Sequence, residues 1–203
     1  MLAWSMLIGY FAARYLLFER LDTYFQYASY IFEFAFVGLA AYLYRGKFRF
    51  ELRPDRRFWA ASALCAIVGF GISVATVKAG VGIPFAMDQG VTIFFLLTLS
   101  PVLEELLFRM ALLLPLAQLL AKRNASVTIA ANAALFAAVH WVAVFQVNSS
   151  VAPFVAVQSV YTLALGGLCA SWMMRTTSVA YPMGLHFFFN VGFYLGAAAC
   201  GLA

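Results

Sequence analysis

Several ionisable and amide side chains lie within stretches of the sequence that are otherwise apolar. They are Arg14, Glu33, Glu104, Glu105, Arg109, Asn132, His140, His186 and Asn190. Charged groups at membrane depth are energetically unfavourable, so each needs a partner or a function that offsets the cost. As structural groups they would form ion pairs and hydrogen bonds between helices. As chemical groups they combine carboxylates, histidines and hydrogen-bond donors, which suits acid–base hydrolysis.

The stretch EELLFR places two adjacent glutamates before an arginine. Glu105 and Arg109 are four residues apart with the acid first, the favourable order for an ion pair along one helix. Glu104 points about 100° away around the helix and has no local partner. A carboxylate in that setting takes up a proton readily. We therefore expect Glu104 to act as a general base, and Glu105 and Arg109 to support the site.

Both histidines of the chain lie in apolar stretches, each with a companion one helical turn away. His140 ends the stretch FAAVH and shares a helix face with Phe136. His186 opens the stretch HFFFN and shares a face with Asn190. A single histidine in an apolar helix is more often a hydrogen-bonding group between helices than a catalyst. Aligned on one face, His186 and Asn190 can nevertheless direct two donors at one oxyanion.

Together these groups suit the attack of water on a carbonyl carbon. Glu104 would take the proton from water and pass it to the leaving amine, while His140 would hold or polarise the water. His186 and Asn190 would stabilise the tetrahedral oxyanion. No serine or cysteine has the setting of a nucleophile, and no HExxH motif occurs. We therefore expect water to be the nucleophile, with no cofactor.

Zinc is the main alternative, because Glu104, His140 and His186 can supply three ligands and leave a position for water. The metal would then activate the water. We favour a site without metal because Asn190 beside His186 suits hydrogen bonding. Outside enzymes, a proton-relaying transporter or an inactive scaffold or immunity protein would also contain buried polar groups. Many transporters are built from internal repeats, and this sequence shows no obvious repeat.

These side chains must be carried by membrane-spanning helices. The 203 residues are 65% hydrophobic and 10% charged, whereas soluble domains have about 45–50% apolar and about 25% charged residues. We expect one integral membrane domain over residues 1–203, an all-α transmembrane helix bundle with a polar catalytic cavity. Seven candidate spans lie at 1–18, 25–44, 58–77, 91–120, 125–146, 152–174 and 178–200. Residues 1–90 hold three spans without a motif, and 91–203 hold the motif-bearing core.

The basic residues are distributed as in a membrane protein rather than a nucleic-acid-binding one. Six of the thirteen lie in residues 45–57. If that loop is cytoplasmic, alternation of the spans places nine basic residues inside and only Arg20 and Lys78 outside. This bias predicts a cytoplasmic amino terminus and contact with the lipid bilayer, not with nucleic acid.

The motifs resemble those of the CAAX-processing and bacteriocin-processing (CPBP, or Abi) family of intramembrane glutamic endopeptidases. EELLFR corresponds to EExxxR, FAAVH to FxxxH and HFFFN to HxxxN, in the same order over about residues 95–195. The resemblance implies an all-helical protease in which Glu104 is the base and His140 its partner. His186 and Asn190 correspond to the histidine and asparagine of the family's HxxxN motif. Met110 follows the motif arginine, where the family frequently has glycine.

The resemblance also implies the substrate class and the location. Eukaryotic members of the family trim the last three residues from prenylated CAAX proteins, and others are linked to bacteriocins or sorting tails. We therefore expect cleavage near the carboxyl terminus of a membrane-anchored protein or peptide. We expect the chain to lie in the inner membrane of a bacterial cell.

Arg14 and Glu33 lie in adjacent predicted spans, outside the motifs. We expect them to pair with each other. In the alternative interpretation they line a path for the substrate, with Arg14 binding its terminal carboxylate.

Overall fold

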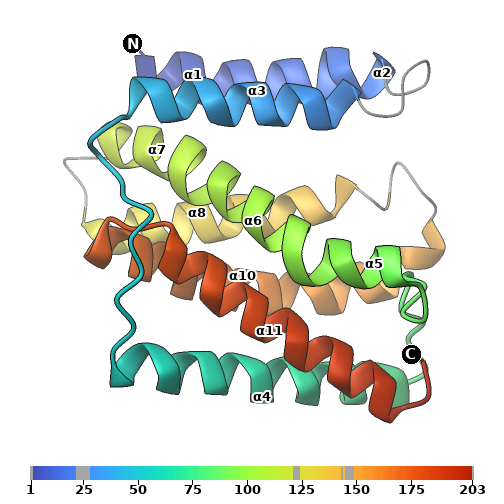
Figure 1. The fold of residues 1–203 in the computed structure, drawn as a ribbon. Coiled ribbons are helices and arrows are strands. Elements are labelled where there is room, and N and C mark those ends of the chain that lie inside the picture. The colour runs from blue at the N-terminus through green and yellow to red at the C-terminus, as the bar shows by residue number, and fades with distance from the viewer. Residues whose placement is uncertain (1, 22–27, 121–123, 143, 145–148, 203) are drawn as a thin grey trace.

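The computed structural model describes residues 2–21, 28–120, 124–142, 144 and 149–202. These residues form seven helical segments and, apart from one isolated bridge, no β-structure. The segments run back and forth along one direction (Figure 1). The first comprises α1 (Leu2–Ala12), the π-helix η1 (Ala13–Phe18) and α2 (Glu19–Leu21), and it is followed by α3 (Ala28–Leu43) and α4 (Arg56–Lys78). The predicted all-α bundle is confirmed.

The remaining segments carry the three motifs. One long run comprises α5 (Gly90–Phe94), η2 (Phe95–Leu99), α6 (Ser100–Glu105), η3 (Leu106–Leu112) and α7 (Leu113–Leu119). It is followed by α8 (Ala125–His140), by η4 (Ser149–Val151) with α10 (Ala152–Thr176), and by α11 (Ala180–Ala199). The helix α8 ends before the predicted boundary at residue 146, and residues 143 and 145–148 lie outside the described part of the chain.

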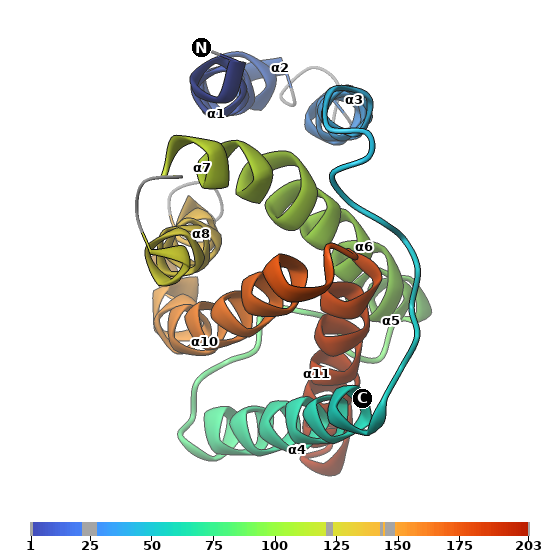
Figure 2. The same cartoon turned by 90° about the vertical axis from the view of Figure 1, so that its left-hand side faces the viewer.

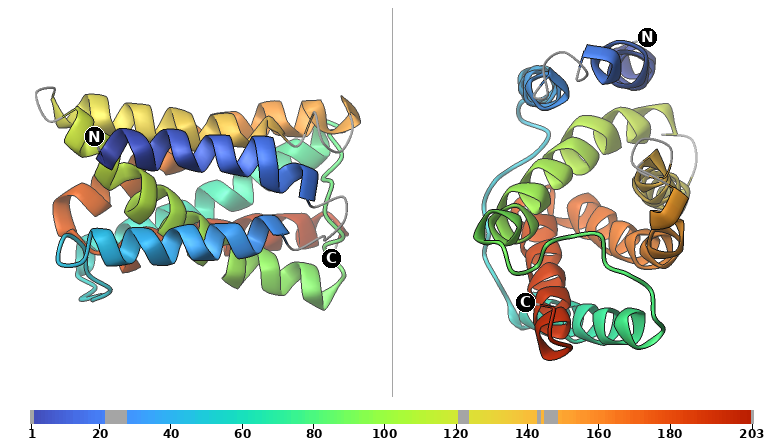
Figure 3. Two further views of the ribbon diagram at one scale, coloured as in Figure 1. Left: turned by 90° about the horizontal axis from the view of Figure 1, so that it is seen from above. Right: turned by 90° about the vertical axis from the view of Figure 1, so that its right-hand side faces the viewer.

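Three helical segments are long and apolar enough to cross a membrane, namely Arg56–Lys78, Gly90–Leu119 and Ser149–Thr176. Leu2–Ala12, Tyr30–Leu43 and Ala125–His140 are apolar but shorter. The protein is therefore an integral membrane protein. The two ends of the chain lie at opposite ends of the bundle (Figure 3).

The long run from α5 to α7 crosses the bundle at a slant (Figure 1). Its two π-helical segments, η2 and η3, each precede a proline, Pro101 or Pro115. Proline has no N–H group and its ring presses on the carbonyl four residues earlier, so the regular hydrogen-bond ladder is disturbed there. The disturbance that the prolines cause takes the form of π-helical segments on both sides of the two glutamates.

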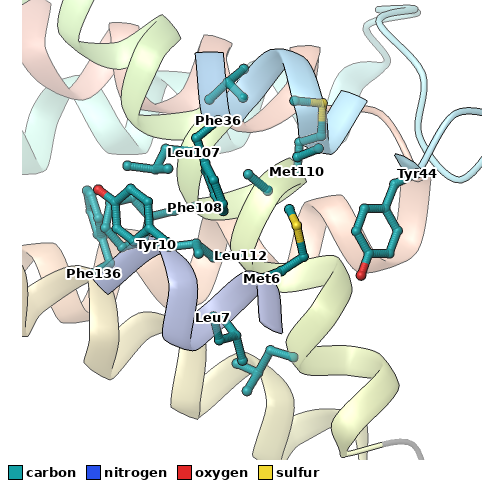
Figure 4. Packing of buried hydrophobic residues seen from close by; sticks show 14 residues of the cluster. Met6, Leu7, Tyr10, Phe36, Tyr44, Leu107, Phe108, Met110, Leu112 and Phe136 are labelled. Carbon is teal, nitrogen blue, oxygen red and sulfur yellow. The ribbon is translucent and has the colours of Figure 1, made fainter. Parts of the chain in front are cut away.

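The first two helical segments form a hairpin against the long run. Figure 2 shows α1 and α3 on one side of the bundle and α4 on the opposite side. Buried side chains of the hairpin pack against η3, α7 and α8 (Figure 4). This cluster includes Met6, Leu7, Tyr10, Phe36, Leu107, Phe108, Leu112 and Phe136. The hairpin is thereby fixed relative to the helix that carries Glu104.

On the other side of the bundle, α11 packs closely on α4 (Figure 2). Gly192 lies directly against the Ala66 carbonyl, and Gly69 against the Phe189 carbonyl, with no room for a Cβ at either glycine. Close backbone approach through small residues is a common way to join helices in membranes. This contact sets the position of the helix that carries the HFFFN motif.

Candidate active site

A fully buried ion pair forms the base of the site. Arg109 Nε donates to Glu105 Oε2 at 2.8 Å, and Arg109 Nη2 lies 3.4 Å from Glu105 Oε1. Arg109 Nη1 donates to Asn132 Oδ1, and Asn132 Nδ2 donates to the Phe108 carbonyl at 3.0 Å. A buried charge is tolerated when it is paired and fully hydrogen-bonded. The ion pair expected from the four-residue spacing is present, and Asn132 anchors it to α8.

Glu105 has a second partner that the sequence did not indicate. His186 Nδ1 lies 2.9 Å from Glu105 Oε1. An ionised carboxylate only accepts hydrogen bonds, so Nδ1 carries the proton of this bond. Glu105 therefore orients the imidazole of His186 as well as pairing with Arg109. The two residues are 81 positions apart, and no local spacing connects them.

Glu104 is the accessible one of the two glutamates. Its side chain is 33% exposed, whereas that of Glu105 is fully buried. Glu104 Oε2 lies 3.9 Å from His186 Nε2, the ring nitrogen that is not bound to Glu105. The offset of about 100° between neighbouring helical residues separates the two acids in this way.

His140 is held by its own helix at the end of α8. Its Nδ1 lies 2.7 Å from the Phe136 carbonyl, which can only accept, so Nδ1 carries a proton. In the neutral imidazole, Nε2 is then an acceptor. The Phe136 ring packs edge-on against both His140 and His186, with centroids 5.1 and 6.0 Å apart. Phe136 therefore separates and supports the two histidines.

Asn190 joins α11 to the long helical run. Its Nδ2 donates to the Leu96 carbonyl at 2.7 Å. Leu96 lies in η2, and Phe108, whose carbonyl binds Asn132, lies in η3. Each π-helical segment thus offers a backbone carbonyl to an asparagine of another helix. An asparagine amide has two N–H donors, and the bond to Leu96 uses one of them.

The four predicted catalytic side chains line one cavity of about 470 Å³. They are Glu104, His140, His186 and Asn190. Such a volume is typical of pockets for small ligands. The structure therefore brings together, in one space, residues from α6, α8 and α11 that lie far apart in the sequence.

Arg14 and Glu33 line the same cavity. Arg14 Nε lies 2.9 Å from Glu33 Oε1, and the Tyr10 hydroxyl donates to the same oxygen at 3.4 Å. The two residues thus form the expected ion pair and also lie in the position that the alternative interpretation required.

A zinc site would need Glu104, His140 and His186 as ligands. Among the described residues, no group of three or more His, Cys, Asp and Glu side chains is arranged to hold a metal ion. Hydrogen bonds at Nδ1, like those of His140 and His186, also occur at zinc-bound histidines. That the site works without a cofactor therefore stays a prediction.

A family model described as type II CAAX prenyl endopeptidase Rce1-like matches residues 86–192, just over half of the chain. The chain belongs to this Rce1-like family. The matched segment contains all three motifs, in agreement with the resemblance found in the sequence. Membership assigns this Rce1-like protein to the CAAX-type intramembrane endopeptidases at the level of the family. No curated protein and no solved structure matches the chain significantly.

Two parts of the candidate site were not expected from the sequence. Asn132 was noted as polar but not assigned to the site, although it shares a helix face with Phe136 and His140. The role of the Leu96 carbonyl could not be predicted from the sequence. Every residue has a backbone carbonyl, so the residue types of an apolar stretch do not show which carbonyl accepts a hydrogen bond from another helix. The proline at position 101 was the nearest indication of irregular backbone there.

Proposed function

We propose that this protein is an intramembrane endopeptidase of the glutamic type, which cleaves near the carboxyl terminus of membrane-anchored, CAAX-like or sorting-tail proteins. The observation that carries the proposal is the accessible Glu104 carboxylate facing Nε2 of His186. The other nitrogen of that ring is held by the buried Glu105–Arg109 pair. A base beside an oriented histidine is the arrangement that general acid–base hydrolysis needs.

The reaction begins with a water molecule in the cavity. Glu104 takes one proton, and the water oxygen attacks the carbonyl carbon of the peptide bond. His140, with Nε2 as an acceptor, holds the water on the side away from its bond to Phe136. Glu104 then gives its proton to the amide nitrogen, the C–N bond breaks, and a carboxylic acid and an amine are released.

Negative charge develops on the carbonyl oxygen during the attack. In its protonated form His186 donates from Nε2 to this oxyanion, while Nδ1 stays bound to Glu105. The second N–H group of the Asn190 amide is the other donor. Hydrogen bonds that strengthen as charge develops lower the barrier rather than only improving substrate binding.

The decisive experiment compares wild type with Glu104→Gln, both purified and reconstituted in vesicles. Each is incubated with prenylated and unprenylated CAAX peptides and with hydrophobic-tail peptides, and the products are identified by mass spectrometry. We expect the substitution to reduce kcat by a factor of about 10² or more, because the base is lost. Glu51→Gln, at an exposed position, is the matched control and should retain full activity.

Two results would contradict the proposal. Loss of wild-type activity on chelation, with recovery on adding zinc, would replace Glu104 by a metal as the activator of water. Absence of cleavage by folded wild type across the peptide panel would favour a non-catalytic scaffold or immunity protein.

A further inference from the structure

The helix α10 lines the cavity although it carries none of the three motifs. It lies between α8, which holds His140, and α11, which holds His186 and Asn190 (Figure 2). Its cavity-lining side chains are spaced three and four residues apart, so they belong to one face of the helix. They are Gln158, Tyr161, Thr162 and Leu165.

The cavity face of α10 is largely polar, whereas the residues between its members are apolar and point outward. Val160 and Leu163 are 73% and 48% exposed, as suits contact with lipid. A polar side chain at membrane depth needs a partner or a function. Thr162 has a partner, because its hydroxyl donates to the Gln158 carbonyl of the same helix at 2.8 Å. The Gln158 amide and the Tyr161 hydroxyl remain as the groups of this face that can serve a ligand.

The ring of Tyr161 packs against the helix that carries the HFFFN motif. Its centroid lies 5.1 Å from that of Phe189 and 6.1 Å from that of Phe193. These buried phenylalanines lie one position before and three positions after Asn190. The Tyr161 hydroxyl also lies close enough to Glu104 for the charge of that carboxylate to act on it. The hydroxyl is therefore near both the proposed base and a proposed oxyanion donor.

Gln158 and Tyr161 can bind a peptide group while they interact with each other. The Gln158 amide interacts with the Tyr161 hydroxyl one helical turn further along. A carboxamide has two N–H donors and an acceptor oxygen, and a hydroxyl has one donor and two acceptor lone pairs. A single bond between them leaves at least one donor and one acceptor for a ligand. A peptide group offers the matching acceptor and donor, its carbonyl and its N–H.

A peptide in this cavity needs such partners. About half of the described side chains that line it are apolar, and burying a peptide group without hydrogen bonds is costly. Of the described lining residues, Gln158 and Asn190 are the two primary amides. Asn190 is bound to the Leu96 carbonyl and is proposed to serve the oxyanion, which leaves Gln158 for the backbone of the substrate.

We propose that Gln158 and Tyr161 form a subsite that hydrogen-bonds the backbone of the substrate, at a peptide group next to the bond that is cleaved. The subsite rests on the proposed endopeptidase function and deepens it. Main-chain groups are the same in every peptide, so this subsite positions the substrate without selecting its side chains. It requires an extended substrate at this point, because a helix already uses its backbone groups internally.

The test uses peptides in which one amide at a time, on either side of the cleaved bond, is replaced by an ester. The replacement removes the N–H donor and weakens the carbonyl acceptor with little change in shape. In reconstituted wild type, the ester at one neighbouring position should lower kcat/KM by about five- to tenfold. Tyr161→Phe keeps the ring and removes the hydroxyl, and Gln158→Leu removes the amide. Each should lower kcat/KM for the all-amide peptide by a similar factor.

The change in the peptide and the change in the protein should not be additive, because they remove the same hydrogen bond. The ester that impairs wild type should cost at most about twofold in Gln158→Leu or Tyr161→Phe, whichever lacks the partner of that group. Tyr42→Phe makes the matched change at a residue that is 64% exposed on α3. It should retain both full activity and full sensitivity to the ester. The same ester penalty in wild type and both subsite variants would overturn the subsite, because a residue that only supports the fold affects all peptides alike.

Binding to the Glu104→Gln variant separates this proposal from the proposed function. This variant should bind the fluorescent all-amide peptide about five- to tenfold more tightly than one member of the ester series. Adding Gln158→Leu and Tyr161→Phe together should abolish the difference. If this preference is present but wild type cleaves no peptide, the subsite stands and the proteolytic function fails. If wild type cleaves the peptides but binds and cleaves amide and ester forms alike, the proteolytic function stands and the subsite is overturned.

Discussion

At the scale of single residues, the two adjacent glutamates have different environments. Glu105 accepts hydrogen bonds from Arg109 and His186 and is fully buried, whereas Glu104 faces the cavity. Glu105 therefore stabilises the site through its hydrogen bonds, whereas Glu104 is accessible to a water molecule. This division follows from a single step along the helix.

The hydrogen bonds of Glu105 predict that its substitution has a large effect on stability. Glu105→Gln leaves the Arg109 guanidinium buried without its counter-charge, so the free energy of unfolding should fall by about 3–5 kcal/mol. Glu51→Gln removes an exposed partner of Arg53 and should change the free energy of unfolding by at most about 1 kcal/mol. Unfolding monitored by circular dichroism in detergent measures both. Equal small effects would show that the buried pair does not hold the site together.

Asn190 should affect turnover more than stability. Asn190→Ala removes a donor to the oxyanion, so kcat should fall by about 10²–10³. Asn132→Ala, which alters the anchor of Arg109 behind the cavity wall, should mainly reduce stability, by about 1–3 kcal/mol. Kinetics and unfolding of both variants distinguish the roles. The assignment of Asn190 would be wrong if its variant kept the wild-type kcat.

At the scale of elements, the positions of the proposed catalytic side chains depend on how α11 packs against its neighbours. This helix carries His186 and Asn190, and it packs on α4 through glycines that leave no space for a Cβ. On its other side, α11 contacts the long run through Asn190 and Leu96. A shift of α11 would therefore move two proposed catalytic groups together.

The tight contact predicts that Gly192→Ala is harmful although it is distant from the chemistry. The added methyl group would overlap the Ala66 backbone, which forces the helices apart and should destabilise the protein by about 1–3 kcal/mol. Activity should fall in the protein that remains folded. Gly71→Ala is the matched control, since its Cβ would meet nothing within 4 Å, and it should be neutral or slightly stabilising. Identical behaviour of the two variants would contradict the role given to this contact.

At the scale of the whole molecule, one end of the bundle is strongly basic. The exposed basic side chains there are Arg45, Lys47, Arg49, Arg53, Arg56, Arg57 and Arg175. The segment between α3 and α4 runs along this end (Figures 1 and 2). It is attached to the turn between α10 and α11 by the backbone bonds Arg49 N to Thr177 O and Val179 N to Arg49 O, 2.7 and 3.0 Å long. We propose that this end faces the cytoplasm.

This orientation can be tested by thiol labelling in intact cells and in inverted vesicles. Lys78→Cys should react with a membrane-impermeant reagent in intact cells, and Arg45→Cys only in inverted vesicles, because the two positions lie at opposite ends of the bundle. Cys200 is partly exposed, so the parent protein should carry Cys200→Ser. The opposite labelling pattern would reverse the predicted topology.

The features that depend on local order could be predicted from the sequence. Long apolar runs specified membrane helices, and the four-residue spacing specified the pair of Glu105 and Arg109. The faces of α8 and α11 followed from the same periodicity. Pro101 and Pro115 left open whether the long run is kinked, tilted or extends past the bilayer.

The contacts between helices could not be predicted from the sequence and are seen in the folded protein. The bond from His186 to Glu105, the bond from Asn190 to the Leu96 carbonyl and the place of Arg14 in the cavity all join distant segments. Periodicity and hydropathy specify which face of a helix is apolar or polar, but not which partner that face meets. The partner depends on the packing of the glycines and aromatic side chains between helices, which determines how all the helices fit together at once.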